Sequence, residues 1–297
     1  MSADGVIVLD KPSGITSFRA VERVSRVFRG RKCGHAGTLD PIATGVLPIC
    51  VGRATKIAGY LAAQEKEYDV FFRFGVETDT GDAAGRQIDA TPGKSAEEDA
   101  VRVAIDGLVG EWEQVPPAYS AIKVAGARAY KLARQGKPVE LAARKVNVYE
   151  ARVLSWSPEG FRVFLRCSKG FYVRALSRDL GKALGVAMTV SGLRRLRSGP
   201  FRIEDSISLA DFVDAGKRGE ARGFLVPIDR ALSGFPRREI PAEAAAAVRQ
   251  GRSPAPWLEG RESVREGGIV LLTSGEEGPV ALVERAASGQ WKIVRGI

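Results

Sequence analysis

The sequence predicts a globular protein of two domains that mixes helices with strands, a large domain first and a small β-rich domain at the C-terminus. Its 297 residues exceed the usual size of a single domain. Hydrophobic residues make up 44% of the chain and charged residues 27%, as in globular proteins that bury a large core. From about Arg238 the pattern changes to a short helix and then to strand-like runs, GIVLLT, PVALVER and WKIVRGI, which indicates the second domain.

The large domain opens with the apolar run GVIVLD, residues 5–10, which we expect to be a strand that ends at a Pro and Gly turn. Thr16 and Ser17 then offer an N-cap for a helix, since valines recur at helical spacing until Gly30. Residues 31–56 contain four glycines and two prolines among apolar residues. This segment is too interrupted for one regular element and too apolar for a solvated linker, so we expect a buried, functional loop.

Alternating apolar residues predict three further strands, at residues 66–74, 146–153 and 162–167. Residues 171–184 return to helical spacing. Between them, residues 115–140 mix Gly, Pro, Tyr and basic residues without a sustained period. We expect this last segment to be an excursion from the core.

The chain is strongly basic, with 45 Lys and Arg against 35 Asp and Glu, a formal charge of +10 and a pI near 9.7. This balance favours a polyanion as the partner. An even spread of charge that serves solubility is the alternative, and clustering of the basic residues distinguishes the two.

The three cysteines lie far apart and form no C-x-x-C pair, so neither a disulfide framework nor a zinc site is indicated. The N-terminus lacks a basic region followed by a long apolar run, and no stretch approaches the roughly 18 apolar residues of a membrane span. We therefore expect a soluble, cytoplasmic protein with reduced thiols.

Several kinds of chemistry are excluded or disfavoured by the sequence. His35 is the single histidine, so mechanisms that need two imidazoles are excluded and His-based metal sites are disfavoured. Gly93-Lys94-Ser95 resembles the end of a phosphate-binding P-loop, but Ile88 occupies the position of its first glycine. The carboxylate-rich residues 77–85 lack calcium-loop spacing, so we interpret them as a polar turn rather than a metal site.

Asp40 is the carboxylate with the clearest chemical setting, since it precedes Pro41 on a glycine-rich loop with basic residues on both sides. An aspartate held on such a loop can act as nucleophile or general base, and a nearby arginine would keep it ionised. An Asx-turn, in which the carboxylate caps the local backbone, explains the same residues. The residues alone leave both interpretations open.

The loop GHAGTLDPIATGVLPICVGRATK resembles the signature of the bacterial TruB family, the tRNA pseudouridine-55 synthases. Five further segments resemble the family in the same order: VLDKPSGITS, KEYDVFFRFGVETDTGD, VPPAYSAIKVAGARAYKLAR, GFYVRALSRDLG and SGLRRLRSGPF. The resemblance runs from about Gly5 to Phe201. Chance agreement of six ordered segments is negligible.

The resemblance implies an α+β pseudouridine synthase fold with a mixed central sheet, followed by a small β domain similar to the PUA module. We therefore expect a catalytic domain over residues 1–237 and an RNA-binding, PUA-like domain over residues 238–297. The expected activity is isomerisation of the T-loop uridine at position 55 of tRNA to pseudouridine, after the nucleotide is flipped out. Because no net atoms are gained, no cofactor is expected. The expected partner is the T-arm of tRNA, and a monomer is expected.

By the same resemblance, Asp40 is the catalytic aspartate that acts on the ribose, as nucleophile or base. Tyr68 matches the tyrosine that stacks on the target base and is a candidate for handling the C5 proton, and Arg174 matches the arginine that pairs with the aspartate. These roles suit a flipped uracil and a buried carboxylate. Without the resemblance, Tyr68 would be interpreted as an ordinary strand aromatic and Arg174 as a solvated helix residue.

Tyr172 and Leu193 match the positions that line the uracil pocket, and His35 matches the histidine that enters the T-loop where the flipped base was stacked. The simpler interpretation of His35 is a turn histidine beside Gly34. Phosphate contacts need charge and shape rather than base readout. The candidates for these contacts are Arg26, Arg29, Arg31, Lys32, Arg194, Arg195 and Arg197.

Two other functions remain as alternatives. The first is a synthase of the same superfamily with a different target uridine, since the chemistry and the choice of target lie in different parts of the chain. The second is a non-catalytic RNA chaperone that binds and remodels tRNA through the same basic surfaces.

The resemblance also implies that residues 116–140 are an insertion that closes over the RNA arm, and we predict that this insertion is mobile without RNA. Amide hydrogen exchange should then be fast in the free protein and slower in the RNA complex, because closure protects the backbone. Equal protection in both states would contradict the prediction.

Overall fold

A computed structural model describes residues 3–120, 123–124, 127–129, 132, 135, 139, 141–258, 264–275 and 278–297. About half of the predicted RNA-closing insertion, residues 116–140, lies outside the described residues. Within the described part, no helix is long and apolar enough to cross a membrane.

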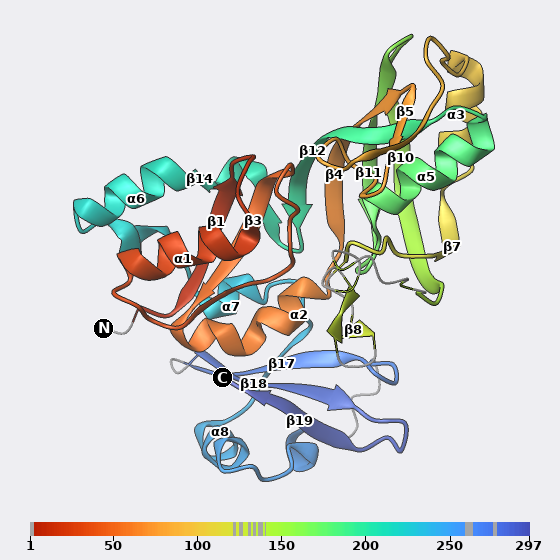
Figure 1. Cartoon of the computed structure of the whole chain (residues 1–297). Coiled ribbons are helices and arrows are strands. Elements are labelled where there is room, and N and C mark those ends of the chain that lie inside the picture. Colours follow the sequence, from red (N-terminus) through yellow and green to blue (C-terminus); the bar gives the residue numbers. More distant parts are fainter. Residues whose placement is uncertain are drawn as a thin grey trace.

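A mixed sheet of eleven strands forms the larger part of the described fold (Figure 1). Its main path runs in the order β14, β1, β3, β12, β4, β11, β10, β7. The bounds are β14 (Ile207–Ser208), β1 (Gly5–Lys11), β3 (Thr44–Val51), β12 (Met188–Ser198), β4 (Lys66–Phe74), β11 (Gly160–Cys167), β10 (Arg144–Ser157) and β7 (Gly110–Gln114). Strands β1 and β14 are parallel, as are β3 and β12, and the other neighbours on this path are antiparallel. The structure thus has the predicted α+β pattern with a mixed sheet.

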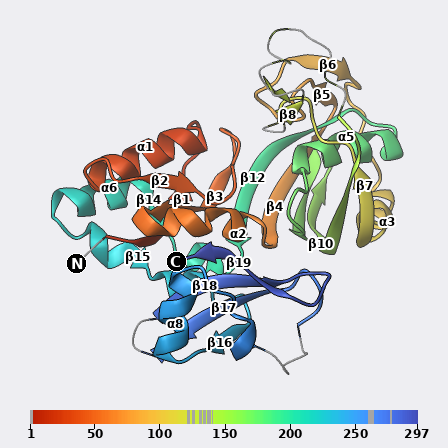
Figure 2. The ribbon, with the colours of Figure 1, turned by 90° about the horizontal axis from the view of Figure 1, so that it is seen from below.

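Strand β12 joins the two halves of the sheet. It pairs in parallel with β3 through Arg194 and Arg195, which lie opposite Thr44 and Gly45. Along most of its length it also pairs in antiparallel fashion with β4. The helices α1 (Ser17–Val27) and α6 (Leu209–Lys217) lie on the β1 and β3 half, and α3 (Glu98–Asp106) and α5 (Val173–Leu184) lie on the other half (Figures 1 and 2).

Shorter elements complete the larger part of the chain. They are the strands β2 (Cys33–His35), β5 (Val76–Thr78), β6 (Gln87–Ala90), β8 (Lys123–Val124), β9 (Ala127–Arg128), β13 (Phe201–Arg202) and β15 (Leu225–Val226), and the helices α2 (Ala58–Ala62) and α7 (Ile228–Ala231). Short 3-10 helices lie at Gly52–Ile57, Ile203–Asp205 and Ala221–Phe224, and another lies in the C-terminal part at Ala255–Trp257.

The C-terminal strands form a separate sheet in the order β16 (Arg237–Glu239), β17 (Ile269–Ser274), β18 (Gly278–Arg285) and β19 (Trp291–Gly296), with α8 (Ala242–Arg249) beside it. Figure 2 shows that these strands form a sheet distinct from the large one. Leu271, Leu282 and Ile297 share a buried cluster with Val6 and Val8 of β1, so the two sheets are packed together. The three predicted strands and the helix are confirmed, whereas the division at residue 238 stays a prediction.

The predicted first helix is confirmed as α1, where the Thr16 side chain accepts a hydrogen bond from the Arg19 amide as the N-cap. The expectation for residues 31–56 is only partly right, because β2 and β3 both form within this segment. From Gly45 to Val51 every residue of β3 is buried. Apolar residues buried on both faces of a central strand show no alternation, so their periodicity did not reveal the strand.

The alternation of apolar residues predicted β4 and β11 correctly. Aromatic side chains on the buried face of these two strands pack against one another. The ring centroids of Phe72 and Phe161 lie 5.2 Å apart, and those of Phe74 and Phe161 lie 5.4 Å apart. Burial of each such ring stabilises the fold by about 1.5–3 kcal/mol. The three cysteines are free thiols, in agreement with the sequence analysis.

Gly45 lies directly opposite Arg195, where β3 pairs with β12. Its φ of 99° is one that side chains rarely adopt, and a Cβ atom there would lie 2.2 Å from the carbonyl oxygen of Arg195. We expect Gly45→Ala to lower the free energy of unfolding by at least about 2 kcal/mol, because both strain and overlap result. Urea unfolding measures this change.

Gly59→Ala is the matched control, since Gly59 lies in α2 with no atom within 4 Å of the added Cβ position. In a helix this substitution should be neutral or stabilise by up to about 1 kcal/mol. Equal effects of the two substitutions would contradict the role assigned to Gly45.

Candidate active site

The loop that carries Asp40 is held by the first turn of α1 and by the turn after β1. The Ser17 hydroxyl accepts a hydrogen bond from the Leu39 amide at 2.8 Å and donates one to the Leu39 carbonyl at 2.9 Å. On the other side of Asp40, the Gly14 amide donates to the Pro41 carbonyl at 2.8 Å. Asp40 therefore lies between two anchored residues, so its position in the fold is well defined.

The Asp40 carboxylate forms a two-point pair with Arg174 from the first turn of α5. Arg174 Nε donates to Asp40 Oδ2 at 2.7 Å, and Nη2 donates to Oδ1 at 3.1 Å. Both carboxylate oxygens thus bond a residue 134 positions away in the chain, which argues against an Asx-turn as the role of this side chain. Such bidentate pairs are short and directional.

Arg174 is itself fixed by further acceptors. Its Nη1 donates to the Thr80 carbonyl at 2.7 Å, and its Nη2 also donates to the Tyr119 carbonyl at 2.9 Å. Arg174 is only 6% exposed, so the interpretation as a solvated helix residue is wrong. The side chain of Asp40, by contrast, is 32% exposed. One side of the carboxylate is therefore open to a substrate while the guanidinium stays buried.

Asp82 is a buried carboxylate of this site that the sequence analysis missed. Its Oδ2 lies 3.6 Å from Arg174 Nε, while its Oδ1 accepts hydrogen bonds from the Thr80 hydroxyl at 2.9 Å and the Ala84 amide at 3.0 Å. The segment had been interpreted as a polar turn. The available signal was the density of carboxylates and glycines in residues 77–85, but only the fold shows that the turn lies against Arg174.

Two buried cations hold the backbone of the Asp40 loop. Lys11 Nζ donates to the Pro41 carbonyl of this loop at 3.4 Å, and to the carbonyls of Pro12 and Ile15 in the turn after β1 at 2.8 Å each. Burial lowers the pKa of Lys11 to about 8, and the nearby charge of Asp40 opposes this shift.

Arg195 is the second of these cations, and it donates to the carbonyls of Val46, Gly37 and Thr38 at 2.7, 3.1 and 3.3 Å. The expectation that Arg195 holds an RNA phosphate is wrong, because the residue is 1% exposed and its guanidinium is engaged by the protein backbone.

Tyr68 and Leu193 lie over the same face of the sheet as Arg195. Tyr68 in β4 is directly opposite Arg195 in β12, and opposite residues of paired strands share a face. Leu193 is two residues before Arg195 on the same strand and therefore points to that face as well. Both predicted pocket residues therefore lie on the face from which Arg195 reaches the Asp40 loop.

Tyr172 lies at the N-cap of α5, two residues before Arg174. The side-chain amide of Gln114 donates to the Tyr172 carbonyl at 3.1 Å and accepts from its amide at 2.8 Å. Burial is the main cause that raises the pKa of both Tyr172 and Tyr68, and the charge of Asp40 adds to the rise in each. Both phenols thus lie within electrostatic range of the carboxylate and stay neutral at physiological pH.

His35 lies at the end of β2, opposite Ile49 of β3 and on the N-terminal side of the Asp40 loop. Among the other predicted phosphate contacts, Arg194 forms a two-point pair with Asp10, and Arg197 pairs with Glu67 at 2.7 Å. Within the described residues, no three His, Cys, Asp or Glu side chains are placed so that they could hold a metal ion.

Comparisons with known proteins agree with this arrangement. Residues 25–173 match the family described as TruB family pseudouridylate synthase (N terminal domain), and residues 174–233 match the tRNA pseudouridylate synthase B C-terminal domain. The tRNA pseudouridine synthase B of Chromohalobacter salexigens is 47% identical over 251 residues, which cover 84% of this chain and 81% of that protein. The protein of the same name from Nitrosococcus oceani is 42% identical, over 92% of this chain and 88% of that protein.

Solved structures resemble the whole chain. A Cbf5-Nop10-Gar1 complex contains a chain with a TM-score of 0.77 and 28% identity, over 99% of this chain and 83% of that one. An H/ACA RNP bound to a substrate RNA containing 2′-deoxyuridine gives a TM-score of 0.74 and 25% identity, over 99% and 85% of the two chains. With a family match over half the chain and relatives this similar, the protein belongs to the TruB family of pseudouridylate synthases.

Proposed function

We propose that this enzyme isomerises the T-loop uridine at position 55 of tRNA to pseudouridine, with Asp40 as the essential carboxylate. The observation that carries the proposal is the two-point pair between the half-open Asp40 and the buried Arg174. The similarity to proteins named tRNA pseudouridine synthase B supports tRNA as the substrate. The reaction breaks the bond from C1′ of the ribose to N1 of the base and forms one from C1′ to C5. The C5 proton is lost and N1 gains one, so no cofactor is required.

Asp40 acts on the ribose of the flipped nucleotide, either by attack on C1′ or by removal of a ribose proton. Both routes need an ionised carboxylate, and Arg174 favours the ionised form through its charge and two N–H donors. The step resembles that of a retaining glycosidase, in which a carboxylate assists cleavage at an anomeric carbon.

Asp82 keeps Arg174 in place during the reaction. When Asp40 engages the ribose, Arg174 would otherwise lose its counter-charge, and an unpaired buried charge costs several kcal/mol. Asp82, at 3.6 Å from Arg174 Nε, supplies the second negative charge. The carbonyls of Thr80 and Tyr119 keep the guanidinium oriented.

The remaining site residues receive the base. A flipped uracil loses its stacking, and the ring of Tyr68 offers an aromatic face in return. The neutral phenol of Tyr68 is also the candidate for handling the C5 proton. Tyr172 and Leu193 line the other sides of the base, and His35 enters the T-loop in its place.

The rest of the chain serves RNA binding in this proposal. Residues 1–237 form the catalytic domain, and residues 238–297 form a PUA-like domain that contacts tRNA. The compact C-terminal sheet of β16 to β19 supports such a module. We further propose a monomer, because this one chain supplies both Asp40 and Arg174. A cytoplasmic location is proposed because the proposed substrate is tRNA.

Asp40→Asn tests the proposal, since it removes the charge and keeps the shape. We expect pseudouridine formation in an unmodified tRNA transcript to fall by at least about a thousandfold, with little change in RNA affinity. Carbodiimide-dependent primer-extension stops map the product, and wild-type protein should give a single stop in the T-loop. A stop at another uridine would indicate a different target. RNA binding without any product from wild-type protein would favour the chaperone.

Asp82→Asn tests the role of the second carboxylate. Its amide nitrogen would face Arg174 in place of Oδ2, because Oδ1 is engaged by Thr80 and Ala84. We expect kcat to fall by about 10- to 100-fold, while KM changes by less than about threefold.

Asp79→Asn is the control for this experiment. Asp79 lies in the same turn, and its Oδ1 accepts only from the Arg86 amide at 2.9 Å among the bonds of the described residues. This variant should turn over at a rate near that of wild type. Single-turnover assays measure the effect, and similar rates for both variants would refute the role of Asp82.

A further inference from the structure

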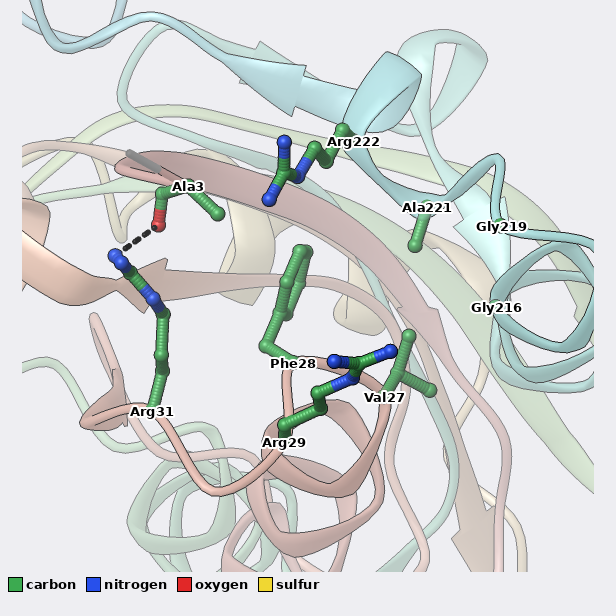
Figure 3. A pocket seen from close by; sticks show the side chains of 9 residues that line it. All are labelled: Ala3, Val27, Phe28, Arg29, Arg31, Gly216, Gly219, Ala221 and Arg222. Carbon is green, nitrogen blue, oxygen red and sulfur yellow. Dashed lines mark hydrogen bonds between the residues drawn. The ribbon is translucent and has the colours of Figure 1, made fainter. Parts of the chain in front are cut away.

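The far end of α1 carries a surface that the catalytic site does not use. A hollow of about 530 Å³ is lined by Ala3, Val27, Phe28, Arg29, Arg31, Gly216, Gly219, Ala221 and Arg222 (Figure 3). A second hollow of about 650 Å³ is lined by Arg23, Arg26, Val27, Arg29, Leu209, Ala210, Val213, Asp214, Gly216 and Lys217. They share Val27, Arg29 and Gly216, so they form one continuous surface between α1 and α6, here called the α1–α6 groove.

The groove carries a strong excess of positive charge. Asp214 pairs with Lys217 at 2.7 Å, and Arg31 pairs with Asp4 at 3.4 Å. The other four cations, Arg23, Arg26, Arg29 and Arg222, form no ion pair with any carboxylate of the described residues. Clustered like charges repel one another, so an anion from outside the chain would stabilise this surface.

Arg29 has a strained backbone conformation just after α1, and its side chain lines the groove. Helix α1 ends with hydrogen bonds from the Arg29 amide to the Arg26 carbonyl at 3.0 Å and from the Gly30 amide to the Ser25 carbonyl at 2.8 Å. This is a Schellman motif, in which the position of Arg29 is usually glycine. With a φ of 54°, Arg29 is the single non-glycine residue of the described chain at positive φ. Such outliers cluster at functional sites.

The shape and chemistry of the groove fit a phosphate backbone rather than a base. Figure 3 shows Arg31 and Arg222 pointing toward the hollow above Phe28, with Arg29 at its edge. The ring of Phe28 packs into the core against Phe212, with centroids 6.0 Å apart, and the residue is 8% exposed. The floor of the hollow is thus apolar but offers little stacking face. The planar guanidinium group of an arginine binds phosphate oxygens through paired N–H donors, and such contacts do not depend on the base sequence of the RNA.

The groove lies well away from Asp40. The first residue of α1, Ser17, bonds to the Asp40 loop, whereas the groove surrounds the last turn. The 11 residues of α1 span about 16 Å. An RNA whose loop reaches Asp40 can therefore extend to the groove through a neighbouring segment.

We propose that the α1–α6 groove binds the phosphodiester backbone of the RNA substrate, at a site separate from the catalytic site. The proposal rests on the proposed function in that the substrate is RNA. It assigns Arg29 and Arg222, which approach the groove from α1 and from the turn after α6, to phosphate contacts. Of the basic residues singled out by the family resemblance, Arg195 thus holds the Asp40 loop, whereas Arg29 is assigned to RNA.

The test is the salt dependence of binding to an unmodified tRNA transcript. For Arg29→Ala with Arg222→Ala, two lost phosphate contacts should reduce the slope of log affinity against log salt concentration by about 1 to 2. Affinity at moderate salt should fall roughly tenfold. Arg29→Gly alone should reduce the slope by about 1. Its thermal unfolding midpoint should equal or exceed that of wild type, because the backbone strain is relieved.

The matched control is Arg102→Ala with Arg218→Ala, which removes the same net charge. Arg102 pairs with Glu98 and Arg218 with Glu220, and neither lines the groove. Equal slopes and affinities for the control and the Arg29 and Arg222 double variant would overturn the proposal. It would also be overturned if inorganic phosphate raised the unfolding midpoint of wild type but not of that double variant, while RNA affinity stayed equal.

Failure of the groove proposal can be distinguished from failure of the proposed function. Absence of pseudouridine from wild-type protein would refute the proposed function, whereas the salt slopes report binding whether or not the reaction occurs. A T-loop product from wild type together with unchanged slopes in the double variant would refute the groove alone.

Discussion

The two-point pair between Arg174 and Asp40 is the contact around which the larger domain is organised. Its partners come from the β2–β3 loop and from the first turn of α5, which are 134 residues apart in sequence. The same guanidinium also binds the carbonyls of Thr80 and Tyr119. A planar fork with five N–H donors can join several segments in fixed directions, which a lysine could not do. The pair therefore sets the orientation of the Asp40 carboxylate and fixes the first turn of α5.

The buried cations Lys11 and Arg195 stabilise the irregular loop that carries Asp40. A loop that turns sharply inside a fold leaves carbonyl oxygens without partners from secondary structure, and burial of such groups is unfavourable. Lys11 donates to the Pro41 carbonyl, and Arg195 donates to the carbonyls of Gly37 and Thr38, so the loop is stabilised without further regular structure. Gly45 permits the close approach of β3 to β12 that brings Arg195 under the loop.

The positive charge of the chain therefore has two separate uses. Arg174 and Arg195 are buried and bind groups of the protein, whereas Arg23, Arg26, Arg29 and Arg222 face outward around the α1–α6 groove. Composition reports only the sum of these charges. Their separation follows from the sheet, because β12 directs Arg195 inward and α1 directs its basic face away from the core.

The sequence by itself determined the elements whose local signals were strong, and through its motifs the identity of the main site residues. The Thr16 cap and the valine spacing predicted α1, alternation predicted β4 and β11, and the ordered motifs singled out Asp40, Tyr68 and Arg174. Periodicity failed for β3, since a strand buried on both faces has no alternation.

Only the tertiary structure decided the role of Arg195, the place of Asp82 beside Arg174, and the meeting of Arg29 with Arg222. In each case the physical reason is the same. Whether a charged side chain is buried, and what it binds, depends on residues far away in the chain, and no local pattern of amino acids records that proximity.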